Sequence, residues 1–365
     1  MAKKIRVLNA VKRKVFNKLG LRYRDNYFVD AFYKKDSRNG VIKIGEHAYP
    51  NNVVLACSDS NDDQKVYSFP KRYIYEIKDA SIWTPDNLIY CSSGKLIAES
   101  SALSVYRLLW EVPLPEFKAR KHLSGQHVYL AINENYYHWL LEDLPVFITA
   151  HKLKPEAKII AKKTQFRPAL DFLEKFFPGC YALVDDNVKC ESLVMAAKTG
   201  GMGAPHDHGV VHPKDVKIVR EWFSDYIPPK TQRRKKVYVS RVGRRRSPEG
   251  EEKLVSRLKA EGFEIFDGSM GLFEQIDYFQ DVEVLVGASG AAFTNILWMA
   301  PGSKVVKLAL DGERLHFFSD LAFYCDVTLH NIDVPSGAWN DSIRESIEAQ
   351  LKSMGFWGGD SSEIL

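Results

Sequence analysis

The sequence predicts an α/β protein with two sheet-containing lobes, a cleft between them and a strand-rich extension before the first lobe. From about residue 127 onward, short apolar runs alternate with helical patterns, which is typical of βαβ units and a largely parallel sheet. The polar segment at 228–236, PPKTQRRKK, interrupts this alternation, which then restarts. Two such sheets predict a ligand site in the cleft, beyond the carboxyl ends of their strands.

The predicted elements follow this alternation along the chain. Between residues 27 and 110 they are short strands in NNVVLACS, KRYIYEI and NLIYCSS. The first lobe is predicted to contain strands at 127–132, 157–162, 181–186 and 192–197, with helices at 136–153 and 167–177. The second lobe is predicted to contain strands at 236–241, 263–267, 282–286 and 304–310, with helices at 247–262, 271–281 and 291–300. A last helix at 341–354 is expected to cross back and brace the first lobe.

The bulk composition indicates a globular protein. The 365 residues, 45% of them hydrophobic, suffice for two domains of ordinary size. A net charge of +5 from 51 basic and 46 acidic residues is too small an excess to indicate a nucleic-acid binder, but it suits anionic ligands or a membrane surface. The five cysteines form no C-x-x-C pair, which favours a reducing compartment, by default the cytosol, and no structural zinc.

The first 24 residues form a basic segment with nine Lys or Arg and no acidic residue. Four apolar residues in it lie at helical spacing: Leu8, Val11, Val15 and Leu19. The pattern predicts an amphipathic helix that either lies on an anionic membrane or packs, solvated, on its own protein. No apolar run in this segment is long enough for a signal peptide or a spanning helix, so we expect a cytoplasmic protein, peripheral at the membrane in the first alternative.

The stretch VLVGASGAAFTN in the second lobe predicts a phosphate site. An apolar strand is followed by a tight turn and then by a helix, whose exposed N–H groups and positive end favour a phosphate or pyrophosphate. Alternatively the turn binds no ligand, because glycine turns between a strand and a helix also occur only to allow close packing. The G-x-G-x-x-G spacing is absent, which disfavours a dinucleotide. The candidate residues in this turn and the following helix are Gly287, Gly290, Ala291, Thr294 and Asn295.

The segment VYVSRVGRRR supplies positive charge for the same site. Arg241 lies at the carboxyl end of a predicted strand and Arg245 follows in the next loop, and guanidinium groups bind phosphate oxygens in a bidentate manner. Arg244 and Arg246 are assigned to a solvated basic loop. The alternative of a nucleic-acid surface is weaker, because KVYVS between the basic runs is a core strand rather than an aromatic platform.

Two further segments carry polar side chains of catalytic type. In NENYYHWLLEDLP, Asn135, His138 and Glu142 are spaced by three and four residues, which predicts that they share one helical face. His138 is alternatively a capping or core histidine beside Trp139. In GGMGAPHDHGVVHP, His206, Asp207, His208 and His212 could bind a metal, but a glycine-rich loop is a poorly preorganised site, so an acceptor-side or interlobe loop is favoured.

Four collinear blocks over residues 125–330 resemble glycosyltransferase family 61, in its bacterial branch of capsular-polysaccharide enzymes. They are NENYYHWLLEDLP, YVSRVGRRRSPEGEEKLVSRLKAEGFEIF, FEQIDYFQDVEVLVGASGAAFTNILWMAPGSKVV and HFFSDLAFY. The resemblance implies a GT-B fold and inverting transfer. It places an acceptor on residues 25–227 and a nucleotide-sugar donor on residues 228–335, with a C-terminal helix and tail at 336–365.

The resemblance also implies roles for single residues. The family's Asn-His-carboxylate set matches Asn135, His138 and Glu142, its Ser-Arg pair and later Arg match Ser240, Arg241 and Arg245, and its glutamine matches Gln275. Two departures stand out. The loop has Ser289 in place of the family's usual histidine and Ala292 in place of a later glycine, and Lys307 replaces an acidic residue after the loop. Serine can still donate a hydrogen bond to a phosphate.

These implications define an expected mechanism. Glu142 acts as the base that takes the acceptor proton, with His138 orienting it or serving as the base. Arg241, Arg245 and the loop amides hold the departing nucleoside diphosphate without a metal or other cofactor. The expected partners are a nucleotide-sugar donor and a glycan or lipid-linked glycan acceptor in capsule or other surface polysaccharide synthesis. The main alternative is a non-catalytic homologue that binds sugar nucleotides, and a nucleic-acid binder is a distant one.

Overall fold

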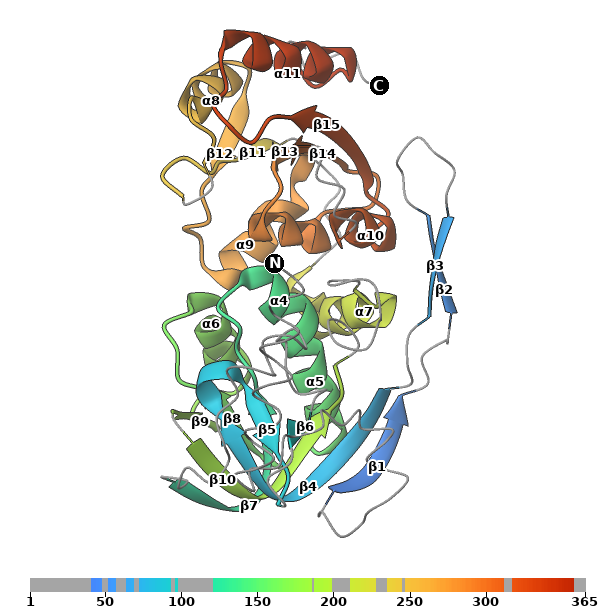
Figure 1. Ribbon diagram of the computed structural model, residues 1–365, viewed down its shortest axis with the longest axis vertical. Coiled ribbons are helices and arrows are strands. Elements are labelled where there is room, and N and C mark those ends of the chain that lie inside the picture. The colour runs from blue at the N-terminus through green and yellow to red at the C-terminus, as the bar shows by residue number, and fades with distance from the viewer. Residues whose placement is uncertain are drawn as a thin grey trace, which may run out of the picture.

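The computed structural model describes residues 41–47, 52–56, 64–68, 72–92, 96–97, 121–185, 187–198, 211–227, 235–244, 247–311 and 317–357. It is a mixed α/β structure with two main sheets, one in the N-terminal half (up to residue 227) and one in the C-terminal half (from residue 235) (Figure 1). The basic segment 1–24, the 206–208 loop and Arg245 lie outside the described residues. Across the described ranges, no helix has the length and apolar character needed to cross a membrane.

The main sheet of the N-terminal half has the strand order β6-β5-β4-β10-β7-β8-β9, with β1 paired to β4. Its strands are β1 (Val41–His47), β4 (Arg72–Trp83), β5 (Leu88–Tyr90), β6 (Leu96–Ile97), β7 (Lys121–Leu130), β8 (Lys158–Lys162), β9 (Tyr181–Val184) and β10 (Asn187–Ala196). Strands β7, β8 and β9 run parallel, and β10 runs parallel to β7. The strands from residue 127 onward are therefore parallel to one another, as predicted, but β10 also pairs antiparallel with β4 of the earlier strand-rich segment along its whole length, so the complete sheet is mixed.

The strand-rich segment before residue 110 therefore joins the same sheet as the βαβ units. One face of this sheet has a small hydrophobic core of its own. In it, Ile77 of β4 and Ile89 of β5 pack with residues of β7, β8 and β10, such as Tyr129 and Ile160. Strands β2 (Asn52–Ala56) and β3 (Gln64–Ser68) form a separate antiparallel pair.

The helix predicted at 136–153 is present but is not regular. It consists of α4 (Tyr136–His138), a π-helical turn η4 (Trp139–Asp143) and α5 (Leu144–Leu153). Pro145 lacks an N–H and its ring would collide with the carbonyl four residues earlier, so a regular helix cannot continue through it. The Leu144 N–H instead bonds to the Trp139 carbonyl, which widens the turn. The other helical segments of this half are η2 (Thr84–Asp86), α6 (Arg167–Phe176), α7 (Pro213–Trp222) and η5 (Ser224–Tyr226).

The sheet of the C-terminal half is fully parallel, as predicted, with the order β12-β11-β13-β14-β15. Its strands are β11 (Lys235–Val239), β12 (Phe263–Phe266), β13 (Val282–Ala288), β14 (Lys304–Leu310) and β15 (Thr328–Val334). Strand β11 comes first in the chain, β12 lies on one side of it and β13 on the other. The order of the strands therefore reverses at β11, and ligands of such sheets bind beyond the carboxyl ends at this point.

The helices of this half are α8 (Glu251–Ala260), α9 (Leu272–Gln280), η6 (Ala291–Trp298), α10 (Phe317–Tyr324) and α11 (Asp341–Ser353). Two details differ from the predictions. Strand β13 continues to Ala288 instead of ending at Val286, and the helix expected from Ala291 is a 3-10 helix. The last helix does not brace the N-terminal half, because Ile347 and Leu351 of α11 pack into the core of the C-terminal sheet.

A single hydrophobic core connects the two halves. It includes Phe147 and Phe172 from the N-terminal half and Phe279, Leu285 and Trp298 from the C-terminal half. Helices α4, α6 and α7 pack against η6, α9 and α10 across the boundary (Figure 1). Side chains therefore fill most of the space between the halves.

Candidate functional site

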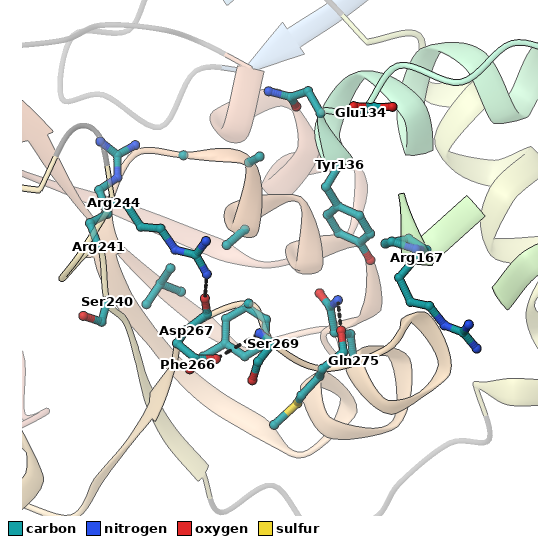
Figure 2. Close-up of a pocket in the computed structure, with 18 of the residues that line it drawn as sticks. Glu134, Tyr136, Arg167, Ser240, Arg241, Arg244, Phe266, Asp267, Ser269 and Gln275 are labelled. Carbon is teal, nitrogen blue, oxygen red and sulfur yellow. Dashed lines mark hydrogen bonds between the residues drawn. The ribbon is translucent and has the colours of Figure 1, made fainter. Parts of the chain in front are cut away.

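A cavity of about 950 Å³ lies between the halves at the point where the C-terminal sheet reverses its strand order. Its C-terminal wall comes from the segments that follow β11, β12 and β13, together with α9, and its N-terminal wall from the starts of α4 and α6 (Figure 2). The lining residues are Glu134, Asn135, Tyr136, Phe166, Arg167, Pro168, Val239, Ser240, Arg241, Arg244, Phe266, Asp267, Gly268, Ser269, Met270, Gln275, Ala288, Gly290, Ala291 and Ala292. Six of the residues singled out from the sequence thus share one cavity: Asn135, Ser240, Arg241, Gln275, Gly290 and Ala291.

Arg241 is held at the end of β11 by a buried carboxylate. The backbone N–H of Arg241 donates to Glu251 Oε1 at 2.8 Å, and the Tyr238 hydroxyl donates to the same oxygen at 3.0 Å. The Ser247 hydroxyl donates to Glu251 Oε2 at 3.0 Å. Glu251 is fully buried in the first turn of α8, where the helix dipole favours a negative charge. The sequence does not indicate this role, because a Glu at a helix start is usually a solvated residue.

Gly287, near the end of β13, and Gly290, in the turn after it, serve different purposes. A Cβ at Gly290 would lie 2.6 Å from Arg241 Nη2, so the absence of a side chain lets the guanidinium group lie against the turn. A Cβ at Gly287 would lie 2.8 Å from the Val239 carbonyl oxygen, within the sheet. Gly287 is buried in β13 and does not line the cavity, so its observed role is the close approach of β13 to β11.

A chain of hydrogen bonds links Gln275, which lines the cavity, to the N-terminal half. Asn295 Nδ2 donates to Gln275 Oε1 at 2.9 Å, and the Tyr136 hydroxyl donates to Asn295 Oδ1 at 3.1 Å. Trp298 Nε1 in turn donates to the Tyr136 hydroxyl at 3.2 Å. Asn295 is fully buried, so in this structure it joins the halves rather than lining the cavity.

The remaining residues proposed for the donor turn lie beneath the cavity surface. Ser289 is 6% exposed and Thr294 is fully buried, and neither lines the cavity. Lys307, which stands in place of the family's acidic residue, is also buried, in the middle of β14.

The three residues predicted to share a helical face are divided by the structure. Asn135 is the N-cap of α4, where its side chain accepts from the Tyr137 N–H at 3.0 Å, and it lines the cavity. His138 Nδ1 and Glu142 Oε1 are 2.8 Å apart, as their spacing of four predicts, but this pair does not line the cavity. Burial disfavours a charge on His138, but the hydrogen bond and the charge of Glu142 outweigh it, so the His138 pKa is raised.

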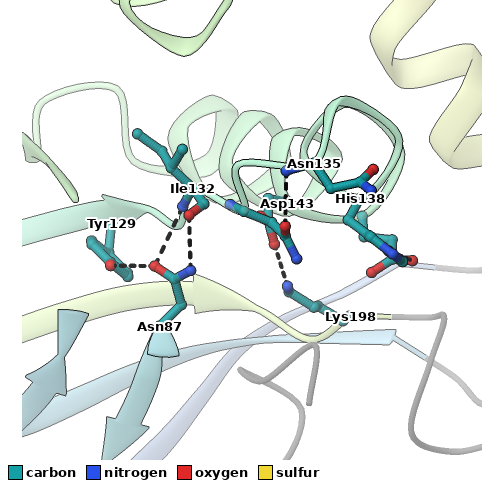
Figure 3. A network of polar contacts seen from close by, with 9 residues as sticks. Asn87, Tyr129, Ile132, Asn135, His138, Asp143 and Lys198 are labelled. Atoms are coloured by element: carbon teal, nitrogen blue, oxygen red, sulfur yellow. Dashed lines mark hydrogen bonds and ion pairs between the residues drawn. The ribbon is translucent and has the colours of Figure 1, made fainter. Parts of the chain in front are cut away.

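A buried ion pair fixes the segment that leads into α4 (Figure 3). Lys198 and Asp143 form the pair, and Asp143 Oδ2 accepts from the Asn133 N–H at 2.8 Å. Burial raises the pKa of Asp143 against the opposing effect of Lys198. On the other side of the segment, Asn87 Oδ1 accepts from the Tyr129 hydroxyl at 2.6 Å and Asn87 Nδ2 donates to the Ile132 carbonyl at 3.1 Å. The residues before Asn135 are therefore held on both sides.

Several residues that line the cavity were not predicted from the sequence to belong to the site. Arg244, assigned there to a solvated loop, is exposed but lines the cavity and donates from Nη2 to the Asp267 carbonyl at 2.8 Å. Glu134 accepts from the Thr164 hydroxyl at 2.8 Å, and Arg167 pairs with Asp171 at 2.5 Å. Asp267 follows β12, and the presence of an acid directly after a predicted strand is a signal that the sequence does contain.

Comparison with known proteins gives a family-model match for the central part of the chain. Residues 136–306, slightly less than half of the chain, match the family model described as Glycosyltransferase 61. No curated protein sequence gives a significant match. The matched segment runs from α4 to β14 and contains both walls of the cavity apart from Glu134 and Asn135.

Two solved structures resemble the chain only faintly. A mutant flavo di-iron protein from Thermotoga maritima has 13% sequence identity and a TM-score of 0.25, with coverage of 84% of this chain and 100% of that chain. The dodecameric iron-containing heptosyltransferase TibC, in complex with ADP-D-beta-D-heptose, has 11% identity and a TM-score of 0.26, with coverage of 80% and 84%. Both TM-scores are too low to indicate a shared fold, so among these comparisons the similarity of residues 136–306 to glycosyltransferase family 61 is the informative one.

Proposed function

We propose that the protein is a glycosyltransferase that holds a nucleotide-sugar donor in the cavity between its halves and transfers the sugar to a glycan acceptor. One observation carries this proposal. The segment that matches family 61 contains nearly all of a cavity that opens where the parallel sheet reverses its strand order, which is where α/β proteins bind nucleotides.

The charges around the cavity suit a diphosphate. Arg241 lies against Gly290, and the Gly290–Ala292 turn lines the cavity at the start of η6. Guanidinium groups and unpaired N–H groups at the start of a helical segment both favour phosphate oxygens. We assign the diphosphate of the donor to Arg241 and this turn, with Ser240 and Gln275 as neighbouring polar groups. For five other residues the donor-binding role predicted from the sequence remains a hypothesis: Arg245, Gly287, Ser289, Thr294 and Asn295.

The two halves then correspond to the two lobes of a GT-B enzyme. The C-terminal half binds the donor and the N-terminal half, through the starts of α4 and α6, faces the acceptor. Transfer is proposed to invert the anomeric carbon: the acceptor oxygen bonds to that carbon, the bond to the diphosphate oxygen breaks, and the acceptor proton passes to a base. The arginine and the turn amides stabilise the departing diphosphate without a metal ion or other cofactor.

Glu142 is the proposed base, with His138 as its hydrogen-bonded partner or replacement. Because this pair does not line the cavity, the role requires the acceptor hydroxyl to lie between Glu142 and the donor sugar, within hydrogen-bonding reach of the carboxylate and facing the anomeric carbon. Asn135, at the start of the same helix, lies on the cavity side and is proposed to contact the reacting sugar.

A non-catalytic protein that binds sugar nucleotides is the second candidate. The position of His138 and Glu142 outside the cavity favours it, as does Ser289 in place of the family's usual histidine. We place transfer above it, because the cavity is lined from both halves, as a reaction between a donor and an acceptor requires.

The biological setting proposed is synthesis of a capsule or another bacterial surface polysaccharide, on a glycan or lipid-linked glycan acceptor. The basic segment 1–24 would bring the enzyme to the anionic inner face of the membrane from the cytoplasm. Both statements extend the resemblance to family 61 and are hypotheses about the whole protein.

The proposal is tested in two stages on the full chain. Thermal-shift assays with UDP, ADP, GDP and CDP, beside single-stranded DNA and RNA, should give stabilisation by one diphosphate and none by the nucleic acids. Incubation with the corresponding nucleotide-sugars and extracted glycan acceptors should then release that diphosphate. Stabilisation without acceptor-dependent release would favour the non-catalytic candidate, and stabilisation by nucleic acid alone would reject both.

A further inference from the structure

Asp267 is a carboxylate in a cavity whose other charged groups on the C-terminal wall are arginines. It follows β12 directly, is exposed, and lines the cavity together with Gly268 and Ser269. A carboxylate repels phosphate, so its presence needs an explanation if the cavity holds a diphosphate. Hydroxyl groups are the natural partners, because an ionised carboxylate only accepts hydrogen bonds.

The turn that carries Asp267 is well defined. Arg244 Nη2 donates to the Asp267 carbonyl at 2.8 Å, and the Ser269 N–H donates to Asp267 Oδ1 at 2.9 Å. Gly268 has a φ of +81°, which a residue with a side chain rarely adopts. Hydrogen bonds from Ser269 lower the Asp267 pKa, so the carboxylate is ionised at neutral pH. These contacts use one side of the carboxylate and leave lone pairs on both oxygens, since each oxygen can accept two hydrogen bonds.

The strand order places Asp267 at a defined distance from the proposed phosphate site. β12, β11 and β13 are neighbours in the sheet, and their carboxyl ends carry Asp267, Arg241 and the Gly290 turn in that order. Two strand spacings correspond to roughly 10 Å. This is of the order of the separation between the hydroxyl edge of a ribose and the terminal phosphate in an extended nucleoside diphosphate.

The other carboxylate on the cavity wall does not compete for this role. Glu134 belongs to the N-terminal half and accepts from the Thr164 hydroxyl. It lies across the cavity from the strand ends that are proposed to hold the nucleotide (Figure 2).

We propose that Asp267 binds the 2′- and 3′-hydroxyl groups of the donor's ribose, and that it makes the site selective for ribonucleotides over deoxyribonucleotides. This inference rests on the proposed function, because it assumes that the diphosphate lies at Arg241 and Gly290. The two vicinal hydroxyls each donate one hydrogen bond to the carboxylate, an arrangement that nucleotide-binding sheets achieve with an acid at a strand end.

The experiment compares matched ligands by isothermal titration calorimetry. UDP, ADP, GDP and CDP are each titrated into the full chain beside their 2′-deoxy and 2′,3′-dideoxy forms. The protein variants are wild type, Asp267→Asn and, as a control, Glu252→Gln, an exposed carboxylate of α8 that does not line the cavity. Asp267→Asn keeps an oxygen for the Ser269 N–H, so the turn is preserved while the charge and one acceptor oxygen are lost.

The wild type and the control should bind the ribonucleotide at least tenfold more tightly than its dideoxy form, since a hydrogen bond to a charged group is worth tenfold or more in affinity. In Asp267→Asn that preference should shrink to less than about threefold, while affinity for the dideoxy form stays within about threefold of wild type. Equal wild-type affinities for the two ligands, or an unchanged preference in Asp267→Asn, would overturn the inference and leave the proposed function intact. If no nucleoside diphosphate binds, both are rejected.

Discussion

At the scale of single residues, the site depends on side chains whose surroundings fix their position. Arg241 is 8% exposed, and its backbone is tied to Glu251, which also accepts from Tyr238 and Ser247. The sequence located Arg241 correctly at a strand end but gave no sign of Glu251, because its donors come from three separate positions that only the fold brings together. Asp267 was overlooked for a related reason: its importance depends on β12 lying next to β11, which the order of elements along the chain does not reveal.

Arg241→Ala should weaken binding of the nucleoside diphosphate by about 1.5–3 kcal/mol, the range for hydrogen bonds to charged groups. Calorimetry on the variant measures this loss. Arg257→Ala is the control, because Arg257 pairs with Glu348 on α11, outside the cavity. Equal losses in the two variants would mean that the general positive charge of this half, and not the position of Arg241, attracts the ligand.

Glu142→Gln should lower turnover by roughly two to four powers of ten while leaving donor affinity unchanged, because a general base contributes about this much. Steady-state transfer rates, with calorimetry for the donor, provide the measurement. Glu134→Gln is the informative comparison, since Glu134 lines the cavity and Glu142 does not. Near-normal turnover in Glu142→Gln together with a large loss in Glu134→Gln would transfer the role of base to Glu134.

The His138–Glu142 pair should also make stability depend on pH. The folded-state pKa of His138 is raised above its usual value, so the pair contributes stability that is fully present below the unfolded pKa and is lost as pH rises through the folded pKa. The His138 side chain is 42% exposed, so solvent screening limits the contribution to about 1 kcal/mol or less. The difference in Tm between wild type and Glu142→Gln should therefore be larger at pH 6 than at pH 8.5. A difference that grows toward high pH would contradict this assignment.

At the scale of elements, the sequence predicted most of the helices and strands but not their irregularities. The alternation of strand and helix from residue 127 was correct, because it depends on local hydrophobic periodicity. The π-helical turn before Pro145 arises because proline has no N–H and its ring would clash with a regular helix. Hydrophobic periodicity does not predict this irregularity. The pairing of β4 with β10 joins segments about a hundred residues apart, and local patterns contain no information about such pairs.

The end of β13 and the turn after it offer a direct test of the roles assigned to Gly287 and Gly290. In Gly287→Ala the new Cβ meets the Val239 carbonyl oxygen, which is part of the sheet and cannot move, so we expect a loss of about 1–3 kcal/mol in the free energy of unfolding. In Gly290→Ala the three atoms nearest to the new Cβ all belong to the Arg241 side chain and none to the backbone, so stability should change less than in Gly287→Ala while affinity for the nucleoside diphosphate falls. Chemical denaturation and calorimetry on both variants distinguish the two effects. The reverse pattern would show that Gly287 faces the ligand and Gly290 serves packing.

At the scale of the whole molecule, the predicted pair of α/β regions is present, but the expectation of an open cleft was too simple. One hydrophobic core extends through both halves, and the Tyr136 hydroxyl bonds across the boundary to Asn295 and Trp298. Sequence periodicity cannot predict this contact, because the apolar face of a helix gives no indication of which element will cover it. The cavity is therefore a pocket beside a packed boundary, and hydrogen bonds join the halves that form its two walls.

The central claim is that the cavity binds the diphosphate of a nucleotide-sugar donor, and a crystal structure of the complex tests it most directly. The full chain would be crystallised with whichever of UDP, ADP, GDP and CDP stabilises it in solution. We expect density for the diphosphate within hydrogen-bonding distance of the Arg241 guanidinium and the N–H groups of the Gly290–Ala292 turn, with the ribose beside Asp267. A nucleotide bound elsewhere on the molecule, with this cavity containing only solvent at saturating ligand, would contradict it.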